Sequence, residues 1–141
     1  MTSLNKHNPK KGADFEILAT FALEKRYGME FFPRSILIGR PKKGHNFDLA
    51  SEKLDIVVEC KCYTWTSSGN APSAKLAMLN EAILYLSYLP TKTKKLIVMR
   101  RNLHPTTKVS LASYYKKRFG HLFKDITLLE LNTDSKILKE I

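Results

Sequence analysis

The sequence predicts an α/β fold in which helices flank a mixed β-sheet within one domain. Short runs rich in valine and isoleucine recur along the chain, and such runs favour strands. Longer amphipathic or apolar segments that end at Gly28 and Pro90 favour helices. A strand, a helix and another strand follow one another between Leu54 and Met99, which is typical of a right-handed crossover between parallel strands.

The chain length and charge narrow the choice of partners. With 141 residues the chain is long enough for one domain with its own core. We expect residues 1–11, which are polar and basic, to form a flexible arm, and residues 12–141 to form the domain. The 24 Lys and Arg against 13 Asp and Glu give a net charge of +11. This excess indicates a polyanionic partner, either nucleic acid or an acidic membrane surface. A basic protein without such a partner is the alternative.

The apolar runs, cysteines and histidines predict the cellular compartment and argue against a zinc site. No apolar run approaches the roughly 20 residues of a membrane span, and no signal-peptide core is present, so we expect a cytoplasmic protein. Cys60 and Cys62 are too few for a disulfide framework and fit a reducing compartment. The histidines show no spacing that would complete a zinc site with them.

The first predicted element is a helix from Gly12 to about Tyr27. Asp14 and Glu16 fall in its expected first turn, where acidic side chains stabilise a helix through its macrodipole. Its expected buried stripe consists of Phe15, Leu18, Ala19 and Ala22.

Two strands are predicted next, Phe31 to Ile38 and Asn46 to Ala50, joined by the basic turn Gly39 to His45. Pro33 suits an edge strand. In the second strand, alternation places Asp48 on the face opposite to its two apolar neighbours, Phe47 and Leu49.

A third strand is predicted over Leu54 to Cys62. Alternation puts Glu59 and Lys61 on one face, roughly 7 Å apart, while the other face is apolar or thiol and forms the core. Asp48 can then meet Glu59 across a hairpin. An exposed Glu59–Lys61 ion pair, worth about 0–1 kcal/mol, is the structural alternative.

The remaining elements continue the alternation of helix and strand. Trp65, in a polar loop, is expected to cap the core. The helix of residues 73–89 is apolar almost all round, so it is either sandwiched or has a second face for a partner. The expected ranges are a helix from Pro72 to about Leu89, a strand Leu96 to Met99, a helix Thr107 to Phe119, a strand Ile126 to Leu131 and a polar tail from Asn132.

The pattern Asp48…Glu59-x-Lys61 resembles the signature of the PD-(D/E)XK nuclease superfamily, which has the restriction-endonuclease-like fold. Phe47 stands where the proline of that signature would be. The resemblance covers roughly Gly12 to Arg101 and implies an αβββαβ core, to which this chain adds a C-terminal αβ pair.

The resemblance also implies a chemistry, the hydrolysis of DNA phosphodiester bonds by an endonuclease that uses Mg²⁺, with Mn²⁺ as a substitute. Asp48, Glu59 and the backbone carbonyl of Cys60 would hold the cation, because Mg²⁺ prefers hard oxygen ligands. Lys61 would orient the attacking water and hold the phosphate. Families with this fold often carry a further acid in the first helix, and Glu16 fits that role better than Asp14.

Two further expectations concern partners. Members of this superfamily commonly act as homodimers, and the helix of residues 73–89 is the expected interface. Cations near the site would contact phosphates without reading sequence. Two alternatives stay open, a non-catalytic nucleic-acid-binding module on the same fold and an RNA nuclease. The expected phosphate-binding residues are Arg40, Lys42, Lys43, Lys94, Lys95, Arg100 and Arg101.

Overall fold

A computed structural model of the chain, which describes residues 9–141, confirms the predicted α/β class. The helices are α1 (Pro9–Tyr27), α2 (Ser73–Ser87) and α3 (Leu111–Phe119), followed by a 3-10 turn, η2 (Gly120–Leu122). The strands are β1 (Phe31–Ile38), β2 (Lys43–Ser51), β3 (Ile56–Lys61), β4 (Lys94–Arg100), β5 (Ile126–Leu131) and β6 (Leu138–Glu140). From α1 to β4 the order is αβββαβ, which is the expected core of a restriction-endonuclease-like fold.

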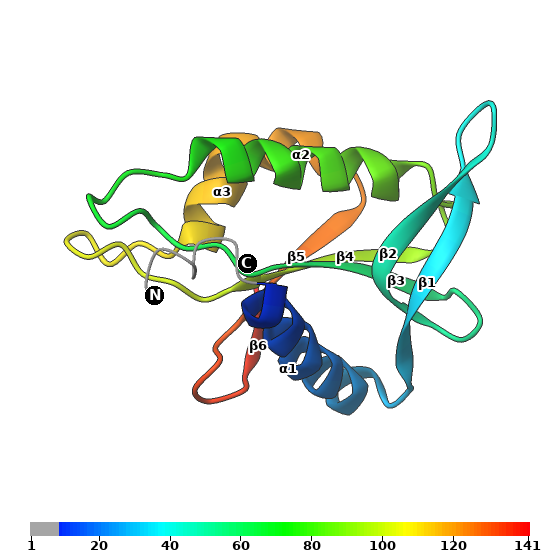
Figure 1. Cartoon of the computed structure of the whole chain (residues 1–141), viewed down its shortest axis with the longest axis horizontal. Helices are drawn as coiled ribbons and strands as arrows, with labels where there is room; N and C mark the ends of the chain where they lie inside the picture. The colour runs from blue at the N-terminus through cyan, green and yellow to red at the C-terminus, as the bar shows by residue number, and fades with distance from the viewer. Residues whose placement is uncertain (1–8) are drawn as a thin grey trace.

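The strands form one sheet in the order β1-β2-β3-β4-β5-β6. β3, β4 and β5 are mutually parallel, which confirms the predicted crossover, and the remaining neighbours are antiparallel. Helix α1 covers one face of the sheet, while α2 and α3 cover the other (Figure 1). The carboxyl ends of β3 and β4 therefore lie at one end of the sheet, where Lys61 pairs with Met99.

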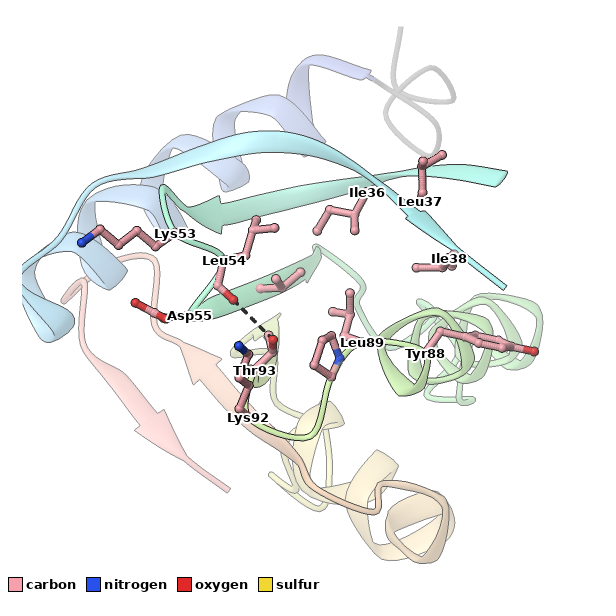
Figure 2. A pocket seen from close by; sticks show the side chains of 12 residues that line it. Ile36, Leu37, Ile38, Lys53, Leu54, Asp55, Tyr88, Leu89, Lys92 and Thr93 are labelled. Atoms are coloured by element: carbon pink, nitrogen blue, oxygen red, sulfur yellow. Dashed lines mark hydrogen bonds between the residues drawn. The ribbon is translucent and has the colours of Figure 1, made fainter. Parts of the chain in front are cut away.

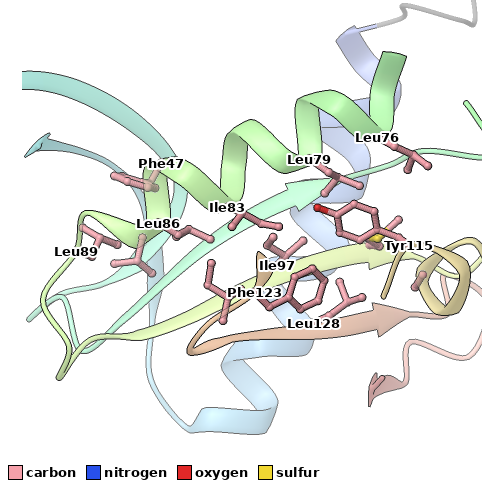
Figure 3. Close-up of a cluster of buried hydrophobic side chains, with 14 of the residues drawn as sticks. Phe47, Leu76, Leu79, Ile83, Leu86, Leu89, Ile97, Tyr115, Phe123 and Leu128 are labelled. Carbon is pink, nitrogen blue, oxygen red and sulfur yellow. The ribbon is translucent and has the colours of Figure 1, made fainter. Parts of the chain in front are cut away.

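Each face of the sheet carries its own hydrophobic core. The core under α2 and α3 is the larger, and its side chains from α2 point down onto the sheet (Figure 3). It includes Leu79, Ile83 and Leu86 of α2, with Ile97 and Leu128 below them. The core under α1 contains Phe15, Ala19 and Leu23 of the helix, packed on Val58, Cys60 and Val98. In the part of the chain that the structure describes, no helix is long and apolar enough to cross a membrane.

Helix α1 begins at Pro9, three residues before the predicted start. Most of the predicted flexible arm, residues 1–8, lies outside the described residues, and its last three residues belong to the helix. Asp14 and Glu16 consequently lie beyond the first turn, which contains no acidic residue. Because the macrodipole effect falls off within one turn, it does not account for Glu16.

The prediction that Phe47 and Leu49 lie on the same face of β2 is wrong, because the strand contains a bulge. Phe32 pairs with Ala50 but Arg34 pairs with Phe47, so three steps along β2 match two along β1. The extra residue places Phe47 in the core under α2 and Leu49 in the core under α1. The bulge thus falls beside Asp48.

The prediction that only one face of β3 is core is also wrong. Val57 is fully buried and Glu59 is 4% exposed, because α2 covers their face of the sheet. A solvent-exposed Glu59–Lys61 ion pair is therefore excluded, and no ion pair of Lys61 occurs within residues 9–141.

The C-terminal part of the fold differs from the sequence prediction in two elements. Helix α3 starts at Leu111 rather than Thr107, because Ser110 caps it by accepting a hydrogen bond from the Ser113 backbone N–H at 3.1 Å. The predicted tail contains the short strand β6, which pairs with β5.

Candidate active site

Two acidic side chains meet where β2 and β3 separate. The ladder between these strands contains the pairs Leu49–Val58 and Ala50–Val57. The rest of β2 stays paired with β1 and diverges from β3 (Figure 1). Beyond the ladder, the Asp48 backbone N–H donates to Glu59 Oε1 at 3.2 Å, and the Cys60 backbone N–H donates to Asp48 Oδ2 at 2.7 Å. Where the β2–β3 ladder stops, the two carboxylates thus accept the hydrogen bonds that backbone carbonyls would accept in a regular ladder. These bonds hold the Asp48 and Glu59 side chains at the opening between the strands.

Burial and mutual repulsion control the charge of this pair. Burial, followed by the nearby charge of Asp48, raises the pKa of Glu59 from 4.5 to about 8, against the opposing effect of Lys61. Burial also raises the pKa of Asp48, although the Cys60 N–H and Lys61 oppose the shift. In the isolated protein, burial and the neighbouring Asp48 therefore favour the protonated form of Glu59.

Glu16 reaches the same region from α1. Its carboxyl group is half-buried, and burial followed by the charge of Asp48 raises its pKa, while Lys61 lowers it. Asp14 is exposed. The structure thus brings Glu16, Asp48, Glu59 and Lys61 into one electrostatic cluster drawn from α1, β2 and β3.

The donor set of this cluster fits a hard divalent cation. Within residues 9–141, Asp48 Oδ1 and Glu59 Oε2 accept no hydrogen bond, so one oxygen of each carboxylate is available. Two carboxylates with water are the usual protein ligands of Mg²⁺. No group of three or more His, Cys, Asp or Glu side chains in the described chain is arranged as a metal site. The side chains alone therefore supply at most two direct ligands, and water or backbone oxygen would supply the rest.

The thiol beside this pair belongs to the core. Cys60 is buried under α1, and burial raises the pKa of its thiol well above the usual value. A neutral thiol is neither a nucleophile nor a metal ligand. This placement leaves the backbone carbonyl as the part of Cys60 that can act at the site.

His45, which the sequence places at the end of the basic turn, lies beside Glu59 in the structure. His45 Nε2 lies 3.8 Å from Glu59 Oε1. The imidazole stacks on Tyr85 of α2, with ring centroids 3.7 Å apart. No local signal identified His45, because alternation along a regular strand would turn it and Asp48 to opposite faces, and its contact with Tyr85 depends on how α2 packs.

The predicted phosphate-binding cations separate into groups. Lys95 is 2% exposed, and its Nζ donates to Asp125 Oδ2 at 2.7 Å and to the Pro90 carbonyl at 3.0 Å, so its predicted role is wrong. Lys94 pairs with Ile56, at the end of β3 opposite to Lys61. Exposed cations also occupy the β1–β2 turn, namely Arg40, Lys42 and Lys43.

Arg100, the last residue of β4, and Arg101, which follows it, lie at the same end of the sheet as Lys61. Arg101 is 39% exposed and donates to the buried Glu130 carboxylate at 3.1 Å. Arg100 is half-buried. These two residues are the predicted cations that the sheet register brings to the site end.

Two loops extend beyond this end and are joined to each other. Trp65 donates through its indole N–H to the Val109 carbonyl at 3.1 Å, and its backbone N–H donates to Asn102 Oδ1 at 2.9 Å. His104 Nε2 lies 2.9 Å from the Gly69 carbonyl oxygen. Trp65 also packs against the larger core, as predicted, so the loops beside Lys61 are held in place.

A separate cavity of about 460 Å³ lies away from the acids (Figure 2). It is lined by the end of β1 and by the segment after α2, including Ile36, Ile38, Tyr88 and Leu89. Its lining is mainly apolar, and none of Glu16, Asp48, Glu59 or Lys61 contributes to it. The candidate site is therefore the opening between β2 and β3 and not this cavity.

No protein-family model and no curated protein matches the chain. Among solved structures, the chain is similar to that of Pyrococcus furiosus SfsA in complex with Ca²⁺, with 15% sequence identity and a TM-score of 0.41. The similarity covers 91% of this chain and 59% of the SfsA chain. This chain therefore spans well under two thirds of that protein, and the likeness at these values assigns neither a family nor an activity.

Proposed function

We propose that this protein is a divalent-cation-dependent DNA endonuclease that hydrolyses phosphodiester bonds. The observation that carries the proposal is the pairing of the half-buried Asp48 with the buried Glu59 at the splayed ends of β2 and β3. Burying two carboxylates together is costly unless a cation compensates them. The raised pKa of Glu59 has the same physical cause, since burial and the charge of Asp48 disfavour its ionised form.

Each residue of the site would have a role that follows from its side-chain chemistry. Asp48 and Glu59 would hold Mg²⁺ or Mn²⁺, together with the backbone carbonyl of Cys60. The cation, when bound, would lower the pKa of a bound water and neutralise charge on the phosphate. Lys61 contributes a mobile ammonium group that can orient the attacking water and bind a phosphate oxygen. Glu16, whose charge influences the same cluster, can accept a hydrogen bond from a water molecule at the site.

The surroundings support a nucleic acid as the substrate. The net charge of +11 favours a polyanion, and Arg100 and Arg101 lie at the same end of the sheet as Lys61. Loops with exposed Thr, Ser and Asn side chains extend from this end, and such groups commonly contact phosphates.

A cleavage panel tests the proposal. Linear, nicked, branched and single-stranded DNA, with matched RNA, would be incubated with the protein in Mg²⁺, in Mn²⁺ and in EDTA. We expect cleavage of at least one DNA substrate in either cation and none in EDTA. Cleavage of RNA alone would identify a ribonuclease. Binding of DNA without cleavage in either cation would instead identify a non-catalytic nucleic-acid-binding module.

A further inference from the structure

His45 projects from β2 toward the candidate site and is held by aromatic contacts. Its ring is nearly parallel to that of Tyr85, with an interplanar angle of 14° and centroids 3.7 Å apart. Phe47 meets the same ring edge-on at 4.6 Å. These contacts fix the plane of the imidazole and hence the direction in which its nitrogen atoms point.

One nitrogen of that ring lacks a partner. His45 Nε2 is buried and has no hydrogen-bond partner within the described chain. A buried polar atom without a hydrogen-bond partner destabilises the folded state, so the presence of one here calls for a physical reason. The nearest charged group is the Glu59 carboxylate, whose Oε1 lies 3.8 Å away.

The gap to Glu59 is small. A hydrogen bond requires a separation of about 3.2 Å or less, so a shift of about 0.6 Å would form one. A carboxylate is a strong acceptor for an imidazole N–H, because hydrogen bonds to a charged acceptor are shorter and stronger than those between neutral groups. Glu59 Oε1 already accepts from the Asp48 N–H, and a second donor there would leave Oε2 for another ligand.

We propose that His45 is a positioning residue, which donates a hydrogen bond from Nε2 to Glu59 Oε1 and so orients this carboxylate for a divalent cation. The inference rests on the proposed function, since it requires a cation at Asp48 and Glu59. Tyr85 supports the imidazole through the stack, so α2 takes part in shaping a site whose acids come from α1, β2 and β3. The other charges that influence the imidazole are those of Asp48, Lys61 and Glu81.

Calorimetric titration of the full chain with Mn²⁺ tests the inference without relying on activity. His45→Phe keeps an aromatic ring for the stack but removes the donor, and we expect Mn²⁺ affinity to fall by about 10- to 100-fold. His45→Gln retains an N–H donor and should recover part of the loss. The same exchange at an exposed histidine, His121→Phe, is the matched control and should leave affinity unchanged.

Variants of Tyr85 provide an independent arm if His45→Phe does not fold. Tyr85→Phe preserves the stacking ring and should bind Mn²⁺ as the wild type does, whereas Tyr85→Leu should weaken binding. In cleavage assays, His45→Phe should lower kcat more than it raises KM for DNA, and excess Mn²⁺ should restore part of kcat. A purely structural role would not produce that rescue.

The outcomes separate this inference from the proposed function. The inference alone would be overturned if the wild type binds Mn²⁺ and cleaves DNA while folded His45→Phe binds Mn²⁺ with unchanged affinity. If His45→Phe does not fold, unchanged Mn²⁺ affinity in Tyr85→Leu would have the same meaning. Wild type that neither binds Mn²⁺ nor cleaves any substrate would overturn both.

Discussion

At the residue scale, Glu59 combines deep burial with a like-charged neighbour. Its carboxyl group lies under α2, next to Asp48, and its pKa rises to about 8. The unfolded chain, by contrast, ionises this group near pH 4.5. The folded protein therefore binds this proton more tightly than the unfolded chain does. Proton binding and cation binding at Glu59 consequently compete.

This competition predicts how stability depends on pH. Because the folded pKa is raised, the stabilising contribution is complete below pH 4.5 and is lost as pH rises toward about 8. In EDTA, the free energy of unfolding should thus be lower at pH 8.5 than at pH 5.5. Glu59→Gln should flatten this dependence, while Glu52→Gln, at an exposed position, should preserve it.

Urea titrations at the two pH values provide the measurement. Addition of Mn²⁺ at pH 8.5 should restore stability to the wild type and much less to Glu59→Gln. Equal pH dependence in the wild type and Glu59→Gln would show that Glu59 is not the group responsible.

At the element scale, β4 illustrates how position in a sheet decides the role of a lysine. Lys94 and Lys95 are adjacent in sequence, but Lys94 is exposed while the Lys95 side chain is buried against Asp125 and the Pro90 carbonyl. Alternation along the strand turns one lysine to solvent and the other inward. Lys95 therefore connects the beginnings of β4 and β5.

Replacing each lysine by alanine should separate these roles. We expect Lys95→Ala to lower the free energy of unfolding by roughly 2–4 kcal/mol, because it removes the buried stem of the lysine and leaves a cavity. Lys94→Ala should change stability by about 0.5 kcal/mol or less. Chemical denaturation of the two variants provides the comparison, and equal losses would contradict the assignment.

The elements that the sequence predicted well are those with strong local signals. The strands Phe31–Ile38 and Ile126–Leu131 have the predicted bounds. The first lies between Gly28 and Gly39 and is an edge strand, which tolerates Pro33, and the second is a mainly apolar run. The bulge at Asp48 and the short strand β6 have no such local signal, since both arise from pairing with other strands. The same holds for the site. Alternation and a known signature selected Asp48, Glu59 and Lys61, whereas His45 required the packing of α2 to be known.

At the scale of the whole molecule, the positive charge should dominate binding to nucleic acid. A net charge of +11 in one small domain should release several counterions when DNA binds. Affinity for a random duplex in Ca²⁺ should therefore fall by at least tenfold between about 50 and 200 mM salt. Fluorescence anisotropy would measure this dependence, and an unchanged affinity would contradict an electrostatic mode of binding.

The basic turn between β1 and β2 allows this prediction to be localised. A variant with Arg40, Lys42 and Lys43 replaced by alanine should show a smaller salt dependence than the wild type if these exposed cations contact phosphates. An unchanged slope would place the contacts elsewhere, with Arg100 and Arg101 as the next candidates.

The expected homodimer through residues 73–89 stays a prediction. The apolar surface that this helix exposes for an interface is smaller than the sequence indicated. Leu79, Ile83 and Leu86 are buried in the core of the same chain, and the large apolar side chains that α2 and its C-terminal end expose are Met78, Leu84 and Tyr88. If these form an interface, sedimentation equilibrium should show a dimer that Leu84→Asp converts to monomer. A monomeric wild type at high concentration would remove the expectation.

Single-turnover cleavage by Lys61→Ala most directly tests whether the cluster between β2 and β3 is catalytic. The variant keeps both carboxylates but removes the ammonium group that would position water and phosphate. We expect it to bind DNA in Ca²⁺ and to bind Mn²⁺ with near wild-type affinity, yet to cleave in Mg²⁺ several orders of magnitude more slowly than the wild type. Lys53→Ala, which removes an exposed lysine before β3, is the matched control and should cleave normally. Cleavage by Lys61→Ala at the wild-type rate would contradict the assignment of this site.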